Sequence, residues 1–289
     1  MKKILCLILC LCACLALAAP ALADAADCAV VGADLSEDQI LSVYEDFGVL
    51  RGSVMELTVT NSEERAYLEG LVSDSLIGTR SISCIYIKLL GSNQGLTVST
   101  KNISWCTEDM YRSALITAGI YDAEVVVTAP FSVSGTAALT GIYKAYETVA
   151  GEELDQDAKE TAAEELVITA ELADELDEDD AVAIVNDLKL ILDETKTMTD
   201  EELAAQIQSI AAQYGYTLDS EWVDKLIELV RSLEKLDVSQ LTEQVEQFRT
   251  TLETAGEYAR QAVGFGQKIA QFFQSIANLF QNLFGSSAD

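Results

Sequence analysis

The sequence predicts an α+β / α/β fold, in which a mixed-sheet α/β domain precedes an antiparallel helical domain and an amphipathic terminal helix. Before Gly151, short β-rich runs alternate with apolar residues at helical spacing, as in a mixed sheet covered by helices. After Gly151 the β-rich runs and proline disappear. From Gly264 the chain is aromatic-rich and nearly uncharged. We expect four parts: a leader at 1–23, the α/β domain at 24–150, the helical domain at 151–263 and the terminal helix within 264–289.

The leader has the pattern of a cleavable secretory signal peptide. Two lysines precede an apolar run over residues 4–19, and small residues precede a cleavage point between Ala23 and Asp24. The run is shorter than the roughly 20 residues that span a bilayer, which disfavours a retained anchor. A lipoprotein signal around residues 11–14 ranks lower. We therefore expect a secreted, extracellular or cell-envelope protein.

The charge of the chain is strongly negative. Lys and Arg number 18 against 48 Asp and Glu, so the net charge is −30, and loss of the two leader lysines leaves −32. Such a field repels nucleic acid and anionic membranes, and it favours cationic partners or metal ions held by carboxylates.

Three cysteines remain after cleavage: Cys28, Cys84 and Cys106. An odd number leaves at least one thiol free or paired between chains. A hairpin turning near residues 92–93 would place Cys84 opposite residue 101 or 102, which disfavours a Cys84–Cys106 disulfide and leaves buried free thiols as the alternative.

The first half of the α/β domain has clear boundary signals. Ser36 and Gln39 form a capping box for a helix that Gly48 ends. Residues 54–60 alternate as a strand does, and Asn61 with Glu64 is expected to open a short helix through Leu71.

The second half of this domain contains two β-rich runs, at 81–90 and 96–105, around a Gly- and Asn-containing turn, so we expect a hairpin. Thr107 is expected to cap a helix that ends at Gly119. A buried strand around residues 125–127 should stop at Pro130, and residues 134–150 should be helical.

The helical domain is predicted from apolar stripes at helical spacing, and Thr199 with Glu202 forms another capping box. Short joints between the stripes indicate antiparallel neighbours. The stripes lie within residues 181–192, 203–214, 222–233 and 241–252.

The chain contains no histidine. This excludes Ser-His-Asp and Cys-His catalysis and zinc sites built on histidine. Glycine-rich nucleotide loops, GxSxG, paired CxxC and EF-hand patterns are also missing from the sequence. We therefore expect no cofactor.

One candidate site is the junction at Ser134, Gly135 and Thr136. Hydroxyls and backbone N–H groups at a helix N-terminus can hold an anion or a partner. The alternative is that Ser134 is only the N-cap of the helix.

A second candidate is the acidic run over residues 171–180. Asp177, Asp179 and Asp180 could bind calcium weakly outside the cell. The alternative is a solvated loop whose charges favour the next helix N-terminus.

The third candidate is the helix at 267–284, which would meet a membrane interface or a partner through an aromatic-rich face. The alternative is that it packs on the helical domain or self-associates. The face comprises Ile269, Phe272, Phe273, Ile276, Phe280, Leu283 and Phe284.

Five segments of the chain resemble the YpuA-like family of secreted Gram-positive bacterial proteins, a domain of unknown function numbered 1002. The resemblance covers nearly all of the chain after the leader and implies a cell-envelope or extracellular setting, without catalytic residues to carry over. The segments are ELTVTNSEERAYLEGLV (56–72), IGTRSISCIYIKLL (77–90), NISWCTEDMY (102–111), SVSGTAALTGIYKAYE (132–147) and AIVNDLKLILDETK (183–196).

The expected function is therefore a non-enzymatic, secreted or cell-envelope protein that binds or scaffolds an envelope or extracellular partner. One alternative is an enzyme that acts on envelope polymers through carboxylates or through Ser134 and Thr136. Another is a weak extracellular calcium binder. The oligomeric state stays open.

Overall fold

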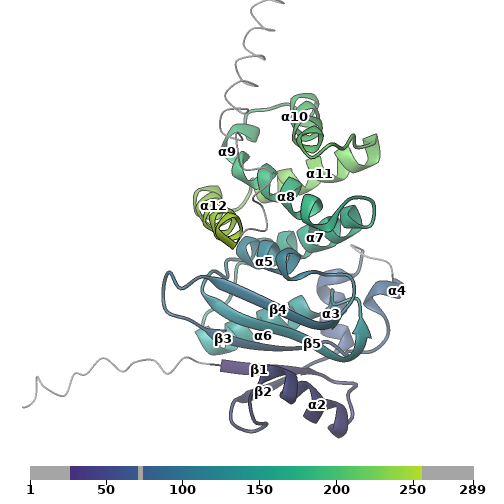
Figure 1. Ribbon diagram of the computed structural model, residues 1–289, viewed down its shortest axis with the longest axis vertical. Helices are drawn as coiled ribbons and strands as arrows, with labels where there is room; N and C mark the ends of the chain where they lie inside the picture. The colour runs from purple at the N-terminus through teal and green to yellow at the C-terminus, as the bar shows by residue number, and fades with distance from the viewer. Residues whose placement is uncertain (1–26, 71–73, 256–289) are drawn as a thin grey trace, which may run out of the picture.

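The computed structural model describes residues 27–70 and 74–255. The fold is α+β, as predicted: a five-stranded mixed sheet with helices packed on it, followed by a stack of helices (Figure 1). Figure 1 shows α2 at one end of the molecule and α10 at the other. Among the described helices, none is both long and apolar enough to cross a membrane.

The sheet has the strand order β2-β1-β3-β5-β4. β1 pairs parallel with β2 and antiparallel with β3, while β5 pairs antiparallel with β3 and parallel with β4. The strands are β1 (Asp27–Gly32), β2 (Met55–Val59), β3 (Cys84–Leu89), β4 (Leu96–Ile103) and β5 (Ala123–Val133).

The predicted hairpin between the third and fourth strands is wrong, because β5 lies between β3 and β4. Val125 and Val127 of β5 are buried, whereas β4 is mostly exposed or half-buried. An apolar strand gains more from the centre of a sheet than a polar one does, so the polar strand takes the edge.

β5 also continues through Pro130, where the sequence predicts a stop. The β4–β5 ladder is irregular between the Lys101–Thr128 and Ile103–Val133 pairs, and Pro130 lies within that interruption. Proline lacks a backbone N–H, so it is tolerated where the ladder needs no donor.

The described helices number eleven and carry the labels of Figure 1. They are α2 (Glu37–Phe47), α3 (Asn61–Leu68), α4 (Asp74–Ile77), α5 (Glu108–Thr117), α6 (Ala138–Ala150), α7 (Gln156–Ala173), α8 (Glu178–Leu190), α9 (Leu192–Thr195), α10 (Asp200–Gln213), α11 (Ser220–Leu233) and α12 (Val238–Ala255).

Local capping explains most of the helix starts. The predicted caps at Ser36, Thr107 and Thr199 are confirmed, each accepting a hydrogen bond from the third residue of its helix. α3 differs, because its capping box is Thr60 with Glu63, one residue earlier than predicted. The next carboxylate, Glu64, is buried instead and accepts a hydrogen bond from the Ser81 hydroxyl at 2.6 Å.

The two faces of the sheet have separate cores. Cys28 and Val30 of β1 contribute to a cluster with α5, α6 and α7, whereas Ala29 and Val31 contribute to a cluster with α2. This is the alternation that a strand imposes on successive side chains.

α7 connects the sheet to the remaining helices. Ala163 and Leu166 belong to the sheet core, while Ile168 and Leu172 belong to the core of α8, α10, α11 and α12. A division of the chain at residue 150 stays a prediction.

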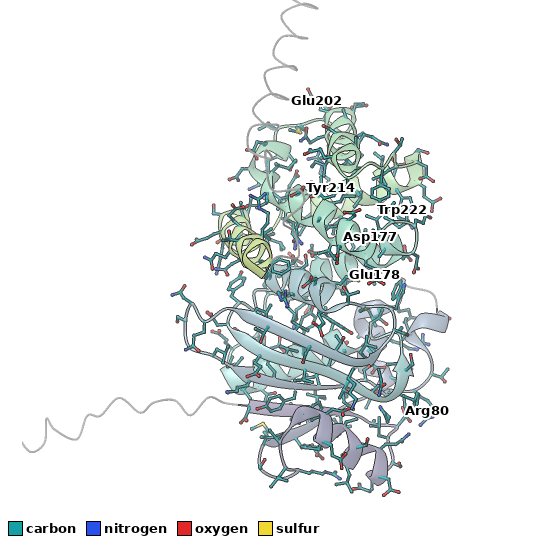
Figure 2. All side chains as sticks on the ribbon, in the orientation of Figure 1. Arg80, Asp177, Glu178, Glu202, Tyr214 and Trp222 are labelled. Atoms are coloured by element: carbon teal, nitrogen blue, oxygen red, sulfur yellow. The ribbon has the colours of Figure 1, made fainter. Side chains whose placement is uncertain are left out.

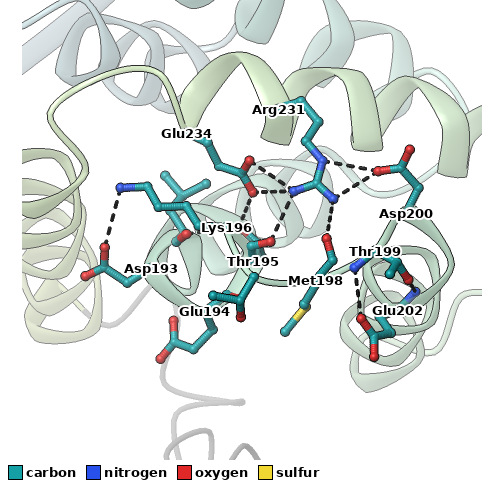
Figure 3. A network of polar contacts seen from close by, with 12 residues as sticks. Asp193, Glu194, Thr195, Lys196, Met198, Thr199, Asp200, Glu202, Arg231 and Glu234 are labelled. Atoms are coloured by element: carbon teal, nitrogen blue, oxygen red, sulfur yellow. Dashed lines mark hydrogen bonds and ion pairs between the residues drawn. The ribbon is translucent and has the colours of Figure 1, made fainter.

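The helical stack is fixed by polar contacts as well as by its core. Arg231 of α11 donates to Asp200 and Glu234 and to the backbone carbonyls of Thr195 and Met198 (Figure 3). One guanidinium thereby holds the α9–α10 connection against α11.

All three described cysteines are buried and free. Cys84 and Cys106 form no disulfide, although the hairpin register that disfavoured one is not present, because β5 lies between β3 and β4. Burial raises the pKa of Cys28 to about 11 and that of Cys84 and Cys106 to about 12, so the thiols stay protonated and unreactive.

Candidate functional site

We call the sheet with α2–α6 (residues 27–150) the sheet half, and α7–α12 (residues 156–255) the helical half. A hollow of about 510 Å³ lies where the two halves meet. We call it the first hollow. The end of α5, the middle of α6, the α6–α7 loop and the start of α12 line it. Ligand sites occur preferentially at such junctions between packed units.

Two tyrosines, Tyr121 and Tyr146, line the first hollow, and both are half-buried. Within the described chain, neither hydroxyl has a hydrogen-bond partner. Burial, with Asp237 and Tyr146 nearby, raises the pKa of Tyr121 to about 12. Burial also raises the pKa of Tyr146, with Glu152 and Asp122 adding to the effect. Both hydroxyls are therefore protonated donors that a ligand could engage.

Carboxylates make up most of the remaining polar lining. Glu152, Glu153, Asp155, Asp157 and Asp237 line the first hollow together with a single cation, Lys235. In the described chain, Lys235 has no carboxylate within ion-pair distance. The lining is therefore strongly negative and suits a ligand with an amine or guanidinium group.

The α6–α7 loop, which supplies Glu152, Glu153 and Asp155, is held in place. Asp155 caps α7 by accepting from the N–H of Ala158 at 2.9 Å. Glu147 accepts from the N–H of Leu154 at 3.1 Å and from Lys159 Nζ at 2.8 Å. The carboxylates of Asp155 and Glu147 thus hold the loop at its junction with α7 and from the side of α6.

Behind the first hollow lies a buried polar network. Lys189 Nζ donates to Glu165 Oε1 at 2.7 Å, to Ser113 Oγ at 2.8 Å and to Thr117 Oγ1 at 3.2 Å. Thr117 donates to Glu165 Oε2 at 2.5 Å and also lines the hollow. Burial lowers the pKa of Lys189, while the Glu165 carboxylate opposes that shift.

Ser113 and Lys189 have the spacing of a serine–lysine catalytic pair, in which the amine activates the hydroxyl. Both are buried, however, and neither lines the hollow. A substrate in the hollow would not touch the Ser113 hydroxyl. The network therefore joins α5, α7 and α8 and serves the fold.

The junction at Ser134, Gly135 and Thr136 differs from its prediction. The helix begins at Ala138, and its N-cap is Ala137 without a side-chain hydrogen bond, so the expected Ser134 cap is wrong. Thr136 is buried, and the Gly135 carbonyl accepts from the Tyr111 hydroxyl at 2.5 Å.

Ser134 lines a separate hollow of about 330 Å³, where Arg80 is the charged lining residue. Figure 2 shows Arg80 on the sheet half. Anion or partner binding at this junction stays a prediction.

The acidic run contributes to folding through aromatic partners. Asp177 caps α8 by accepting from the N–H of Asp179 at 3.1 Å, and Asp180 accepts from the Tyr216 hydroxyl at 3.0 Å. Figure 2 shows Asp177 and Trp222 in the helical half. Over residues 27–70 and 74–255, no three Asp, Glu or Cys side chains converge as a metal site requires, so calcium binding gains no support.

Both tryptophans of the chain donate hydrogen bonds to the turn between α7 and α8. Trp105, which follows β4, donates its indole N–H to Asp174 at 3.1 Å. Trp222 of α11 donates to Glu175 at 2.8 Å. Two neighbouring carboxylates thus hold the end of α7 to the sheet half and to α11.

Two predicted features lie outside the described residues: the cleavage point at Ala23 and Asp24, and the helix face within 267–284. Both stay predictions.

Sequence reasoning missed the first hollow. Tyr121, Tyr146, Glu152 and Asp237 come from four segments, and none stands within a recognisable motif. The density of acids just after Gly151 was a weak signal, since acids also favour helix starts.

Comparison with known proteins gives a relative of undetermined function. The chain is 37% identical over 270 residues to a protein of Bacillus subtilis (strain 168) described as uncharacterized protein YpuA, covering 91% of this chain and 92% of the relative. No solved structure matches the chain. The model of a family of proteins of unknown function, DUF1002, matches residues 31–250. The chain therefore belongs to the DUF1002 family.

Proposed function

We propose that this chain is an exported, non-enzymatic binding protein of the cell envelope or extracellular space, and that the first hollow holds a cationic group of its ligand. The observation that carries this proposal is the lining of the hollow: two tyrosines, whose hydroxyls have no hydrogen-bond partner among residues 27–70 and 74–255, and five carboxylates.

The chemistry of the lining supports an amine. A carboxylate accepts hydrogen bonds from an ammonium group with added Coulombic attraction, and tyrosine rings attract cations through their faces. The net charge of −32 that remains after loss of the two leader lysines raises the local concentration of cations and speeds their approach.

A binding experiment tests this part of the proposal. Isothermal titration of residues 24–289 with cadaverine, a diamine small enough for the first hollow alone, should give saturable binding that weakens with salt. The variant Glu152→Gln/Asp237→Asn should weaken the binding roughly fivefold, because each lost contact is worth up to about 1 kcal/mol.

The matched control is Glu45→Gln/Glu201→Gln, which removes the same charge from exposed positions on α2 and α10. This control should bind cadaverine as the unaltered protein does. Equal weakening in both variants would show that cadaverine responds only to the overall charge of the protein. The absence of saturable binding would contradict the proposal.

Export is tested separately in the producing cell. Fractionation should recover the protein outside the cytoplasm, and N-terminal sequencing should begin at Asp24. Recovery in the cytoplasm with Met1 intact would contradict export but would not bear on the proposed binding site.

A further inference from the structure

We infer that the ligand of this site is an extended, lysine-rich peptide segment that continues from the first hollow into a second one across α7. The inference rests on the proposed function and specifies its ligand.

The second hollow has a volume of about 540 Å³. It lies between α3, α7 and the end of α11, and it shares Asp157 and Lys235 with the first hollow. Because the same two side chains line both spaces, the hollows adjoin at the first turn of α7. Together they are larger than a single amine or small diamine would fill.

The second hollow repeats the charge pattern of the first. Its carboxylates are Glu69, Asp157, Glu160 and Glu164. Burial raises the pKa of Glu164, while a hydrogen bond from Ser232 opposes that shift. A half-desolvated carboxylate gains more than an exposed one from a cation placed beside it.

The spacing of these acids favours a repeating ligand. Asp157, Glu160 and Glu164 stand at positions i, i+3 and i+7 of α7 and so share one face of the helix. At about 1.5 Å per residue, they extend over roughly 10 Å. Side chains on one side of an extended peptide recur about every 7 Å, so two successive lysines on that side can reach this row.

Lys235 distinguishes a peptide from a polyamine of equal charge. Lys235 lines both hollows where they adjoin, and its ammonium group would repel an amine placed directly beside it. A peptide brings backbone carbonyls, which accept hydrogen bonds from an ammonium group and from the two tyrosine hydroxyls. A polyamine has no such acceptors.

Titration with two probes tests the inference: tetralysine with blocked termini, and spermine, which carries the same four charges. Tetralysine should bind the unaltered protein at least tenfold more tightly than spermine. The second-hollow variant Glu160→Gln/Glu164→Gln should weaken tetralysine about tenfold and leave cadaverine unchanged. The first-hollow variant Glu152→Gln/Asp237→Asn should weaken both.

The outcomes separate the two proposals. If Glu160→Gln/Glu164→Gln binds tetralysine normally while the first-hollow variant weakens cadaverine, the proposed function stands and the peptide inference fails. Spermine binding as tightly as tetralysine would also overturn the inference of a peptide ligand. If no probe binds, both proposals fail. Unchanged melting temperatures, with Glu45→Gln/Glu201→Gln as the control for charge, show that each variant is folded.

Discussion

Lys189 Nζ lies 2.7 Å from Glu165 Oε1, and the two side chains are 0% and 1% exposed. The pair is buried where α5, α7 and α8 meet, and where the core of the sheet adjoins the core of the helices that follow it. Its polar neighbours Ser113 and Thr117 satisfy the remaining donors and acceptors.

Removing one member of this pair should destabilise the protein severely. Lys189→Met leaves the Glu165 carboxylate buried without its cation, which costs about 3–5 kcal/mol. Urea unfolding followed by circular dichroism measures the loss. The double variant Lys189→Met/Glu165→Leu should recover part of it, because neither charge then remains. A single variant as stable as the unaltered protein would contradict this account of the pair.

The buried carboxyl of Asp187 should make stability depend on pH. Burial raises its pKa from 3.8 to about 6, although the Tyr214 hydroxyl and Arg249 oppose the shift and Glu246 adds to it. The folded state then binds the extra proton between about pH 4 and pH 6. The contribution of Asp187 is fully present below its unfolded pKa and is lost as the pH rises through the folded value.

Asp187→Asn should therefore flatten the stability profile between pH 4 and pH 6, by no more than about 1.4 kcal/mol per pH unit. Urea midpoints at several pH values check this against the unaltered protein. An identical slope in both proteins would show that Asp187 titrates normally.

Gly135→Ala should cost more than the same change at another glycine with positive φ. At Gly135 the φ angle is +99°, and an added Cβ would lie 2.5 Å from Tyr111 Oη. Overpacking adds about 1–3 kcal/mol to the backbone strain of roughly 1 kcal/mol. Gly48→Ala is the control, because φ is +70° there and the space beside it is open. Equal thermal shifts for the two variants would rule out the steric contribution.

The three thiols should react only after unfolding. Each is buried, and burial raises each pKa well above neutrality, so little thiolate forms in the folded protein. A colorimetric thiol reagent should detect almost none in residues 24–289 under native conditions and three in guanidinium. Rapid labelling of the folded protein would contradict the burial.

Local signals predicted much of the fold. The boxes at Ser36 and Thr199 need only a hydroxyl and a partner three residues on, so they are visible in sequence. The strand order could not be predicted from local signals, because β5 lies between β3 and β4 and its pairing joins residues far apart in the sequence. Alternation in β4 shows a half-exposed strand without indicating its neighbour.

The candidate site was less predictable than the fold. Tyr121 and Asp237 become neighbours only after α12 packs beside α5, more than a hundred residues along the chain. An aspartate just before a helix has an ordinary local reason to be there, because its charge favours the helix N-terminus, and a single tyrosine in a loop belongs to no motif. Only the folded structure, in which Tyr121 and Asp237 line one hollow, identifies them as candidate site residues.

The attachment of Trp105 and Trp222 to one turn gives the protein an intrinsic optical reporter. The chain has two tryptophans, and they donate to the adjacent carboxylates Asp174 and Glu175. Its indole emission therefore originates on either side of the α7–α8 connection. A change in that emission will record separation of the helices from the sheet, whereas melting of β1 and β2 must be followed by another signal.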